Sequence, residues 1–430
     1  MGLQLSLSLP KQLVKSGTAA IYADQALVSG LNFLSSVLLA RYLGLEGFGV
    51  YSIAWLGVMI ASSFNQPFII APMQTLSGKK TDAAYSEYMQ ALVFKQLFFA
   101  ALMGLLSFFV VIMMSYVLDK WKVQSIILAF PLAVFAFLLQ DFFRRYFFVI
   151  GKPYKSLLID AIAYGGVLIA AFAIHFVRSM DAQFILLLTA VFFLYASLIG
   201  LWSLDQLRFN PRVIKATILE HWDFSKWLTV TALLQWFSGN LFIIAAGAIL
   251  GPVAVGVTRM AQNIVGITHV LFLAMENIIP VRASNHQREG GNEELFRYLW
   301  KFALQMGAVT LSLLTLLAIF SKQIILLFYG AEFVIYQHIL IGFCALYVII
   351  FIGYPLRYAI RTLENTRLIF ISFIASSVFS VLTAYPIIKA FGLNGVLIGL
   401  GITQLITLFI YYFSLRKEVA KLSDGEPILN

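Results

Sequence analysis

The sequence predicts an all-α, polytopic membrane protein with twelve transmembrane helices in two six-helix bundles related by a pseudo-two-fold axis along the membrane normal. Three observations predict this fold class: a strongly apolar composition, long uninterrupted apolar runs, and short motifs that return half a chain later. Hydrophobic residues make up 61% of the chain and charged residues only 12%, and the mean hydropathy is +0.89. Soluble domains carry about a quarter charged residues, so this chain is not expected to be water-soluble.

Runs of about twenty apolar residues match the thickness of the bilayer core, so each run predicts one transmembrane helix. Closed β-barrels, the other structure that lipid tolerates, need short alternating segments instead. Hydropathy predicts spans at 16–39, 48–72, 90–117, 123–148, 155–177, 183–204, 226–250, 253–279, 298–320, 336–361, 367–389 and 392–415.

The positive charges predict the orientation of these spans. Most of the 30 lysine and arginine residues lie in alternate loops, on the side that also holds both termini. Such loops stay in the cytoplasm, so we expect a multi-pass membrane protein with both termini cytoplasmic. The net charge of +10 follows from this topology, and no nucleic-acid partner is expected.

A repeated motif divides the chain into two halves. The stretch "LLARYLGLEGFGVY" returns as "AAGAILGPVAVGVT", which pairs Gly44 with Gly251 and Gly49 with Gly256. Each copy is expected to form a tight outer turn between two helices. Glycine permits such a turn and lets two backbones approach closely.

A second match, "DFFRRYFFVIGKPYKSLLI" over "YPLRYAIRTLENTRLIFIS", ends the fourth and tenth spans. Both matches therefore hold equivalent places in two six-helix halves, an architecture in which transporters bind substrate between the halves. The sequence predicts an N-terminal bundle at 1–204, an amphipathic cytoplasmic connector at 205–225 and a C-terminal bundle at 226–430.

Polar side chains share one face of the first span and one face of the eighth. Because a charge that faces lipid is costly, we expect these faces to point into the bundle interior. In the first span these are Thr18, Tyr22, Gln25, Ser29, Asn32 and Ser36, with Asp24 on the flank; in the eighth they are Arg259, Gln262, Asn263, Gly266, His269, Glu276 and Asn277. We interpret both faces as the wall of a substrate cavity. Helix packing through polar side chains is the alternative.

Arg259 is the candidate ligand for an anionic group, because a guanidinium binds phosphate oxygens at two points. The candidate substrate-binding residues are Arg259, Asp24, Asn32, Gln25, Asn263 and His269, with Asp24 and Glu276 as candidate coupling residues. Two alternatives stay open for Arg259: an ion pair with Asp24, or contact with the outer lipid headgroups.

Basic residues end the fourth and tenth spans and form a candidate cytoplasmic gate, made of Arg144, Arg145, Arg357 and Arg361. Positive-inside topology explains these charges equally well.

Prolines are expected to kink several spans, at Pro67, Pro72, Pro131, Pro355 and Pro386. In "NQP", the side chains of Asn65 and Gln66 are able to cover backbone groups that Pro67 frees.

The sequence carries no sign of an enzyme. "SGKKT" lacks the upstream glycine and the hydroxyl residue of a phosphate-binding loop, and the five histidines show no metal-ligand spacing. We therefore expect no catalytic residues, metal or cofactor.

The chain resembles the oligosaccharide flippase, or polysaccharide transporter, family of the multidrug/oligosaccharidyl-lipid/polysaccharide (MOP) superfamily. The resemblance rests on "ARYLGLEGFGVYS" after the first span, "RRYFFVIGKPY" after the fourth and "FGLNGVLIGLGITQL" at the start of the twelfth. It implies a flippase that moves polyprenyl-pyrophosphate-linked oligosaccharide from the cytoplasmic to the outer leaflet by alternating access, for surface polysaccharide biosynthesis. Its implied partners are this glycan lipid, membrane lipids and other polysaccharide assembly proteins.

The resemblance also bears on two residues. The lipid II flippase of the same superfamily has cavity arginines and an aspartate in its first span, which supports Asp24 and Arg259. The sister branch of the superfamily implies a second function, a cation-coupled multidrug exporter.

Overall fold

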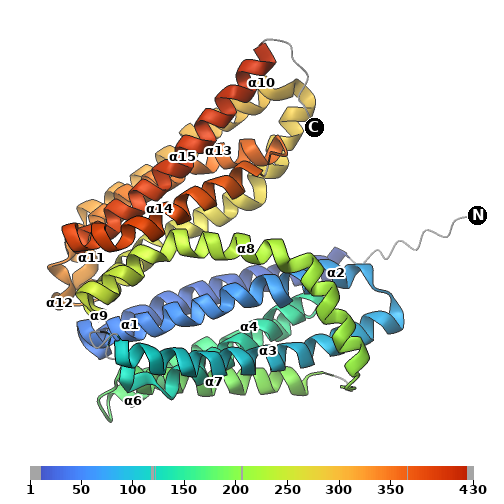
Figure 1. Cartoon of the computed structure of the whole chain (residues 1–430), viewed down its shortest axis with the longest axis vertical. Helices are drawn as coiled ribbons and strands as arrows, with labels where there is room; N and C mark the ends of the chain where they lie inside the picture. The colour runs from blue at the N-terminus through green and yellow to red at the C-terminus, as the bar shows by residue number, and fades with distance from the viewer. Residues whose placement is uncertain (1–10, 118–120, 122, 205–206, 366, 424–430) are drawn as a thin grey trace, which may run out of the picture. The chain divides into compact units, whose positions relative to one another are not determined.

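The structure is a computed structural model and describes residues 11–117, 121, 123–204, 207–365 and 367–423. In this part of the chain every regular element is helical (Figure 1). The elements are α1 (Lys11–Asn65), η1 (Gln66–Ile70), α2 (Ala71–Leu76), η2 (Ser77–Lys79), α3 (Asp82–Val117), η4 (Val123–Ile126), α4 (Ala129–Val149), α5 (Pro153–Asp160), η5 (Ala161–Gly165), α6 (Gly166–His175), α7 (Ala182–Trp202), α8 (Pro211–Leu250), α9 (Pro252–Val265), α10 (Thr268–Ile319), α11 (Ser321–Phe328), α12 (Ala331–Val334), α13 (Gln337–Thr362), α14 (Arg367–Phe391) and α15 (Asn394–Ser423).

The predicted all-α membrane fold is confirmed. Within the described ranges, nine helices are long and apolar enough to cross a membrane, and they include every predicted span except the fourth and the eighth. The fourth span lies in α4 but carries three charges, Asp141, Arg144 and Arg145. The eighth is divided between α9 and α10, so neither piece qualifies over the predicted range.

The chain forms two compact units. Unit 1 comprises the residues up to Leu43 together with Ala54–Thr229, and unit 2 comprises Gly44–Ile53 together with the residues from Val230 on. In unit 1, α4 packs against α3, α5 and α7; in unit 2, α13 packs against α9, α10 and α15. The division at 1–204, 205–225 and 226–430 and the symmetry axis stay predictions.

The two repeated turns contact each other inside unit 2. Gly44 and Gly251 have φ angles of 66° and 93°, in the left-handed region that favours glycine. A Cβ on Gly49 would lie 2.2 Å from the Pro252 carbonyl oxygen, so only glycine fits this backbone contact. The glycine pairs seen in the sequence are therefore required by the turns and by their packing.

The structure contains helices in two places where no span was predicted. Helix α8 begins at Pro211, inside the predicted connector and well before the predicted span at 226–250. The short helices α11 and α12 replace the outer loop expected after the ninth span. Phe333 of α12 is buried with its ring 6.1 Å from that of Phe48, which explains why the first turn belongs to unit 2.

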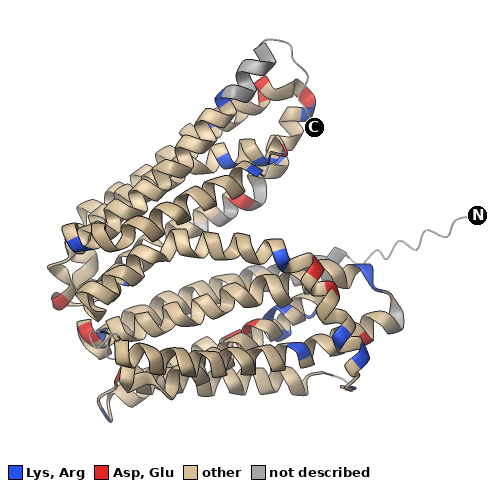
Figure 2. Cartoon of the chain, viewed as in Figure 1, with Lys and Arg blue, Asp and Glu red and all other residues tan. Residues whose placement is uncertain are grey.

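Figure 2 shows how the charges are distributed within unit 1. Most of its blue lysine and arginine positions lie toward the helix ends near α2 and the N-terminus of α8. This is the end that the sequence predicts to be cytoplasmic.

Candidate functional site

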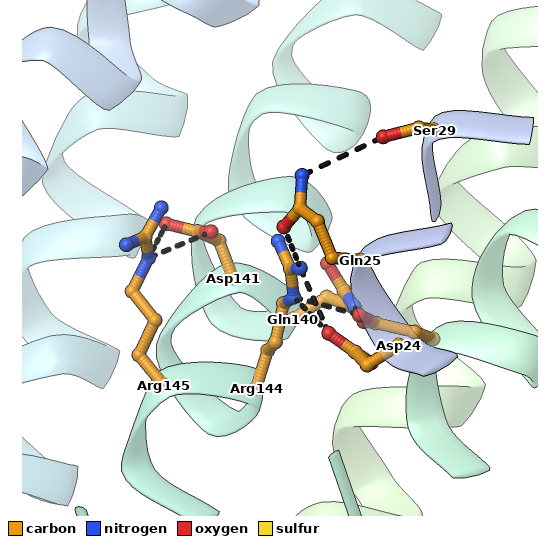
Figure 3. Close-up of polar contacts among 8 residues, drawn as sticks. Asp24, Gln25, Ser29, Gln140, Asp141, Arg144 and Arg145 are labelled. Atoms are coloured by element: carbon orange, nitrogen blue, oxygen red, sulfur yellow. Dashed lines mark hydrogen bonds and ion pairs between the residues drawn. The ribbon is translucent and has the colours of Figure 1, made fainter. Parts of the chain in front are cut away.

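The strongest polar cluster of unit 1 joins three helices through one guanidinium (Figure 3). Arg144 of α4 forms an ion pair with Asp24 of α1, Nη2 to Oδ2 2.8 Å, and a second with Asp160 of α5, Nε to Oδ2 2.7 Å. The Asp24 and Asp160 side chains are 1% and 0% exposed. Two buried carboxylates thus share one cation. We call Asp24, Arg144 and Asp160 the acidic cluster.

Two glutamines extend the acidic cluster. The Gln140 amide donates a hydrogen bond to Asp160 Oδ1, and Arg144 Nη2 lies 3.5 Å from Gln25 Oε1. Gln25 Nε2 in turn lies 3.5 Å from the Ser29 hydroxyl, so the polar stripe of the first span leads from the cluster along α1 (Figure 3). Asn32, farther along this stripe, is exposed.

Asp160 is a functional candidate that the sequence reasoning missed. It ends α5, and a π-helical turn, Ala161–Gly165, follows it directly. Single π-turns inside longer helices occur frequently at functional sites. Its position in the sequence could have identified it, since Asp160 is a carboxylate within the predicted span at 155–177. Charges inside the membrane are rare and usually functional.

The predicted gate arginines of unit 1 separate into two environments. Arg145 Nε donates to both carboxylate oxygens of Asp141, at 3.0 and 3.1 Å, which forms the expected pair four residues apart. Arg144 instead belongs to the acidic cluster, together with the predicted substrate residue Asp24. Residues assigned to gate and cavity on sequence grounds are therefore in direct contact.

In unit 2, Arg259 is partly buried, and its guanidinium makes few hydrogen bonds. Its Nη1 donates to Gln262 Oε1 at 3.1 Å, and its Nε is buried with no hydrogen-bond partner in the described part of the chain. Within unit 2, no described carboxylate lies within the 4.0 Å ion-pair distance of Arg259. Tyr347 of α13 lies close enough to interact with it electrostatically and shares a 3.1 Å hydrogen bond, hydroxyl to Nε2, with His269. We call Arg259, Gln262, Tyr347 and His269 the arginine cluster.

The predicted eighth span comprises two helices. Helix α9 ends at Val265, and α10 begins at Thr268 after a turn at Gly266. The common polar face of this span stays a prediction. Tyr347 of α13 lies near Arg259 and bonds to His269, so it links the two residues. Asn263 is half-buried near the end of α9.

The predicted gate residues of unit 2 also differ from one another. Arg361 Nη1 lies 3.2 Å from Glu276 Oε1, with the two side chains 40% and 41% exposed. The Arg357 guanidinium lies over the Tyr354 ring, 5.1 Å from its centroid, and its Nε is buried with no hydrogen-bond partner among the described residues. The candidate coupling residue Glu276 is thus paired with a candidate gate residue.

Asp24 and Arg259 belong to different units, and each has its partners within its own unit. Among the residues that the structure describes, no group of three or more histidine, cysteine, aspartate and glutamate side chains is arranged to hold a metal ion.

Comparison with known proteins identifies the fold. No protein-family model and no curated protein matches the chain. Among solved structures, the inward closed conformation of the lipid II flippase MurJ is similar with a TM-score of 0.71 and 14% identity, over 93% of this chain and 87% of that one. An inward-facing multidrug resistance MATE family transporter matches with a TM-score of 0.71 and 15% identity, over 94% and 96% of the two chains.

A MOP superfamily transporter from Pyrococcus furiosus, described as having a binding pocket of reverse polarity, matches with a TM-score of 0.59 and 15% identity over 95% of this chain and 96% of that one. The chain therefore has the fold of the MOP superfamily transporters, as the sequence motifs indicated.

Proposed function

We propose that this protein is a flippase that moves polyprenyl-pyrophosphate-linked oligosaccharide from the cytoplasmic to the outer leaflet by alternating access, for surface polysaccharide biosynthesis. The observation that supports this proposal is Arg259, a partly buried arginine with a buried, unused Nε donor and no described carboxylate partner in unit 2. Burying an unpaired charge is expensive, so such a residue is retained where an anion completes the site.

A pyrophosphate fits the donors of the arginine cluster. The guanidinium offers a planar fork for two phosphate oxygens, and the Tyr347 hydroxyl is able to donate to a third. In this arrangement His269 Nε2 carries the ring proton and donates to the Tyr347 hydroxyl, 3.1 Å away, which leaves the hydroxyl proton for the phosphate. The similarity to a lipid II flippase adds support, because the fold accommodates a lipid-linked cargo. In this proposal Gln25, Asn32 and Asn263 line the path of the polar headgroup.

The acidic cluster has a different proposed role. Arg144 is already paired with Asp24 and Asp160, so its charge is not available to a pyrophosphate. The cluster has one more carboxylate than cations, which suits the predicted coupling role of Asp24. Arg145, Arg357 and Arg361 stay as the proposed cytoplasmic gate, with Glu276 as the second candidate coupling residue.

The proposed location is the bacterial inner membrane, with both termini in the cytoplasm. Such a flippase receives its cargo from glycosyl transfer on the cytoplasmic leaflet and delivers it to polysaccharide assembly proteins outside.

The test is leaflet-resolved transport of a labelled polyprenyl-pyrophosphate glycan in proteoliposomes. Arg259→Ala should abolish transport, and Arg259→Lys should restore only part of it, because a lysine lacks the two-point fork. Arg297→Ala is the matched control, since Arg297 is an exposed arginine paired with Glu293 at 2.8 Å. Transport by Arg259→Ala at the rate of the control would refute the assignment.

A cation-coupled multidrug exporter is the second candidate function. The excess carboxylate of the acidic cluster and the similarity to a multidrug resistance transporter favour it. Efflux of cationic dyes from cells or vesicles that carry the protein distinguishes this function from the flippase.

A further inference from the structure

The second membrane span contains a backbone irregularity, which we call the kink. A π-helical turn, η1, separates α1 from α2, and prolines stand at positions 67 and 72. The Ala71 N–H donates to the Gln66 carbonyl instead of the Pro67 carbonyl, which it would reach in an α-helix. Pro72 has no N–H and so leaves the Phe68 carbonyl without its helical donor. The Pro67 and Phe68 carbonyls thus need partners outside the helix.

The residues expected to supply those partners do not do so. The sequence favoured the neighbouring Asn65 and Gln66 as covers for the freed backbone. The Asn65 side chain is fully buried, and neither its Nδ2 nor its Oδ1 has a hydrogen-bond partner in the described residues.

Helix α8 supplies the missing donors. The Ser225 hydroxyl donates to the Pro67 carbonyl, and His221 Nδ1 lies 3.0 Å from the Phe68 carbonyl oxygen. Both side chains are fully buried. Trp222 stacks on the Phe68 ring with centroids 5.9 Å apart. One short stretch of α8 therefore covers both carbonyls and the side chain between them.

Residues of α3 complete this arrangement. Lys95 Nζ also donates to the Phe68 carbonyl, at 2.8 Å, and the Tyr88 hydroxyl lies 2.8 Å from His221 Nε2. Because a carbonyl only accepts, Nδ1 carries the proton toward Phe68, and Nε2 accepts from Tyr88. Tyr88 thereby fixes the orientation of the imidazole. The Lys80–Glu220 ion pair, at 2.7 Å, holds the same part of α8.

Helix α8 runs without interruption from unit 1, which holds its residues up to Thr229, into unit 2, which begins at Val230. We propose that His221 and Ser225 are positioning residues that hold the kink of the second span, so that α8 transmits its own movement to that kink. This role goes beyond the proposed function and does not depend on which cargo is carried. The α8 side chains alone hold the Pro67 carbonyl, and they share the Phe68 carbonyl with Lys95 of α3.

The test is hydrogen–deuterium exchange of the full-length protein in lipid nanodiscs, read in peptides that cover 64–76. His221→Ala/Ser225→Ala should raise exchange there about tenfold, because the buried Pro67 carbonyl is left without a donor and the Phe68 carbonyl keeps only Lys95. Adding Pro72→Ala restores the backbone N–H of residue 72, which donates to the Phe68 carbonyl in an α-helix. In that background the same double substitution should raise exchange by less than about threefold.

Ser197→Ala is the matched control, because Ser197 is a buried serine that bonds to the Phe193 carbonyl of its own helix. It should leave the 64–76 peptides unchanged. If the double variant does not fold, Ser225→Ala alone should raise exchange in the 64–76 peptides about fivefold, because the Pro67 carbonyl then has no donor. An increase of equal size throughout unit 1, or an increase in the double variant that Pro72→Ala does not reduce, would overturn the proposal.

Discussion

Replacing Arg144 by methionine tests the charge balance of the acidic cluster. Arg144 is the only cation paired with Asp24 and Asp160 in the described structure, and both carboxylates are almost inaccessible to solvent. Removing one partner of a buried ion pair costs about 3–5 kcal/mol, because the remaining charge stays buried without compensation. Here two carboxylates lose their partner together. The ratio of folded to unfolded protein should fall by at least about a hundredfold.

The assay is the free energy of unfolding from a denaturant titration in mixed micelles, followed by tryptophan fluorescence. Asp160→Asn is the informative control, because it leaves Arg144 paired with Asp24 in a balanced ratio and should cost much less. Neutralising the whole cluster, by adding Asp24→Asn and Asp160→Asn to Arg144→Met, should recover most of the loss. If Arg144→Met were as stable as Asp160→Asn, the guanidinium would not be what compensates these carboxylates.

Two further substitutions test other contacts. Glu276→Gln removes an exposed ion pair with Arg361 and should change the free energy of unfolding by less than about 1 kcal/mol. If Glu276 is a coupling residue, this variant should lose transport driven by an imposed pH gradient while its stability is unchanged. Unchanged transport would exclude the coupling role. Gly49→Ala places a Cβ against Pro252 and should destabilise the protein by about 1–3 kcal/mol in thermal unfolding. Gly30→Ala is the control and should not destabilise it, because the space around Gly30 is open. Equal effects of the two substitutions would contradict the close contact between the turns.

Much of the fold was predictable, because the bilayer imposes length and hydropathy on each span. The repeated glycines also predicted two turns that the structure contains, at Gly44 and Gly251. The N-terminal part of α8 was not predictable in this way, because its helix is held by contacts to α3 and to the second span. Hydropathy records none of these contacts.

The candidate site was only partly predictable. Asp24 was predicted as a cavity residue and Arg144 as a gate residue, although the two side chains form an ion pair. Because 120 positions separate them and one sequence contains no contact information, their pairing was not predictable. Asp160 was passed over, although its place in an apolar span was visible. The eighth span was expected to be one helix but is divided into α9 and α10 at Gly266, because hydropathy does not register such a turn.

The charge balance of each unit now separates the two candidate functions. The acidic cluster of unit 1 has two carboxylates for one guanidinium, whereas neither Arg259 nor Arg357 has a described carboxylate of unit 2 within 4.0 Å. A partly buried cation without such a partner attracts an anionic headgroup and repels a cationic drug. Removing Arg259 therefore has opposite expected effects: a flippase for pyrophosphate-linked glycans loses transport, and an exporter of cationic compounds keeps or gains it. Measuring both cargoes on the same Arg259→Ala protein assigns the function from the sign of the change, even where absolute rates differ between preparations.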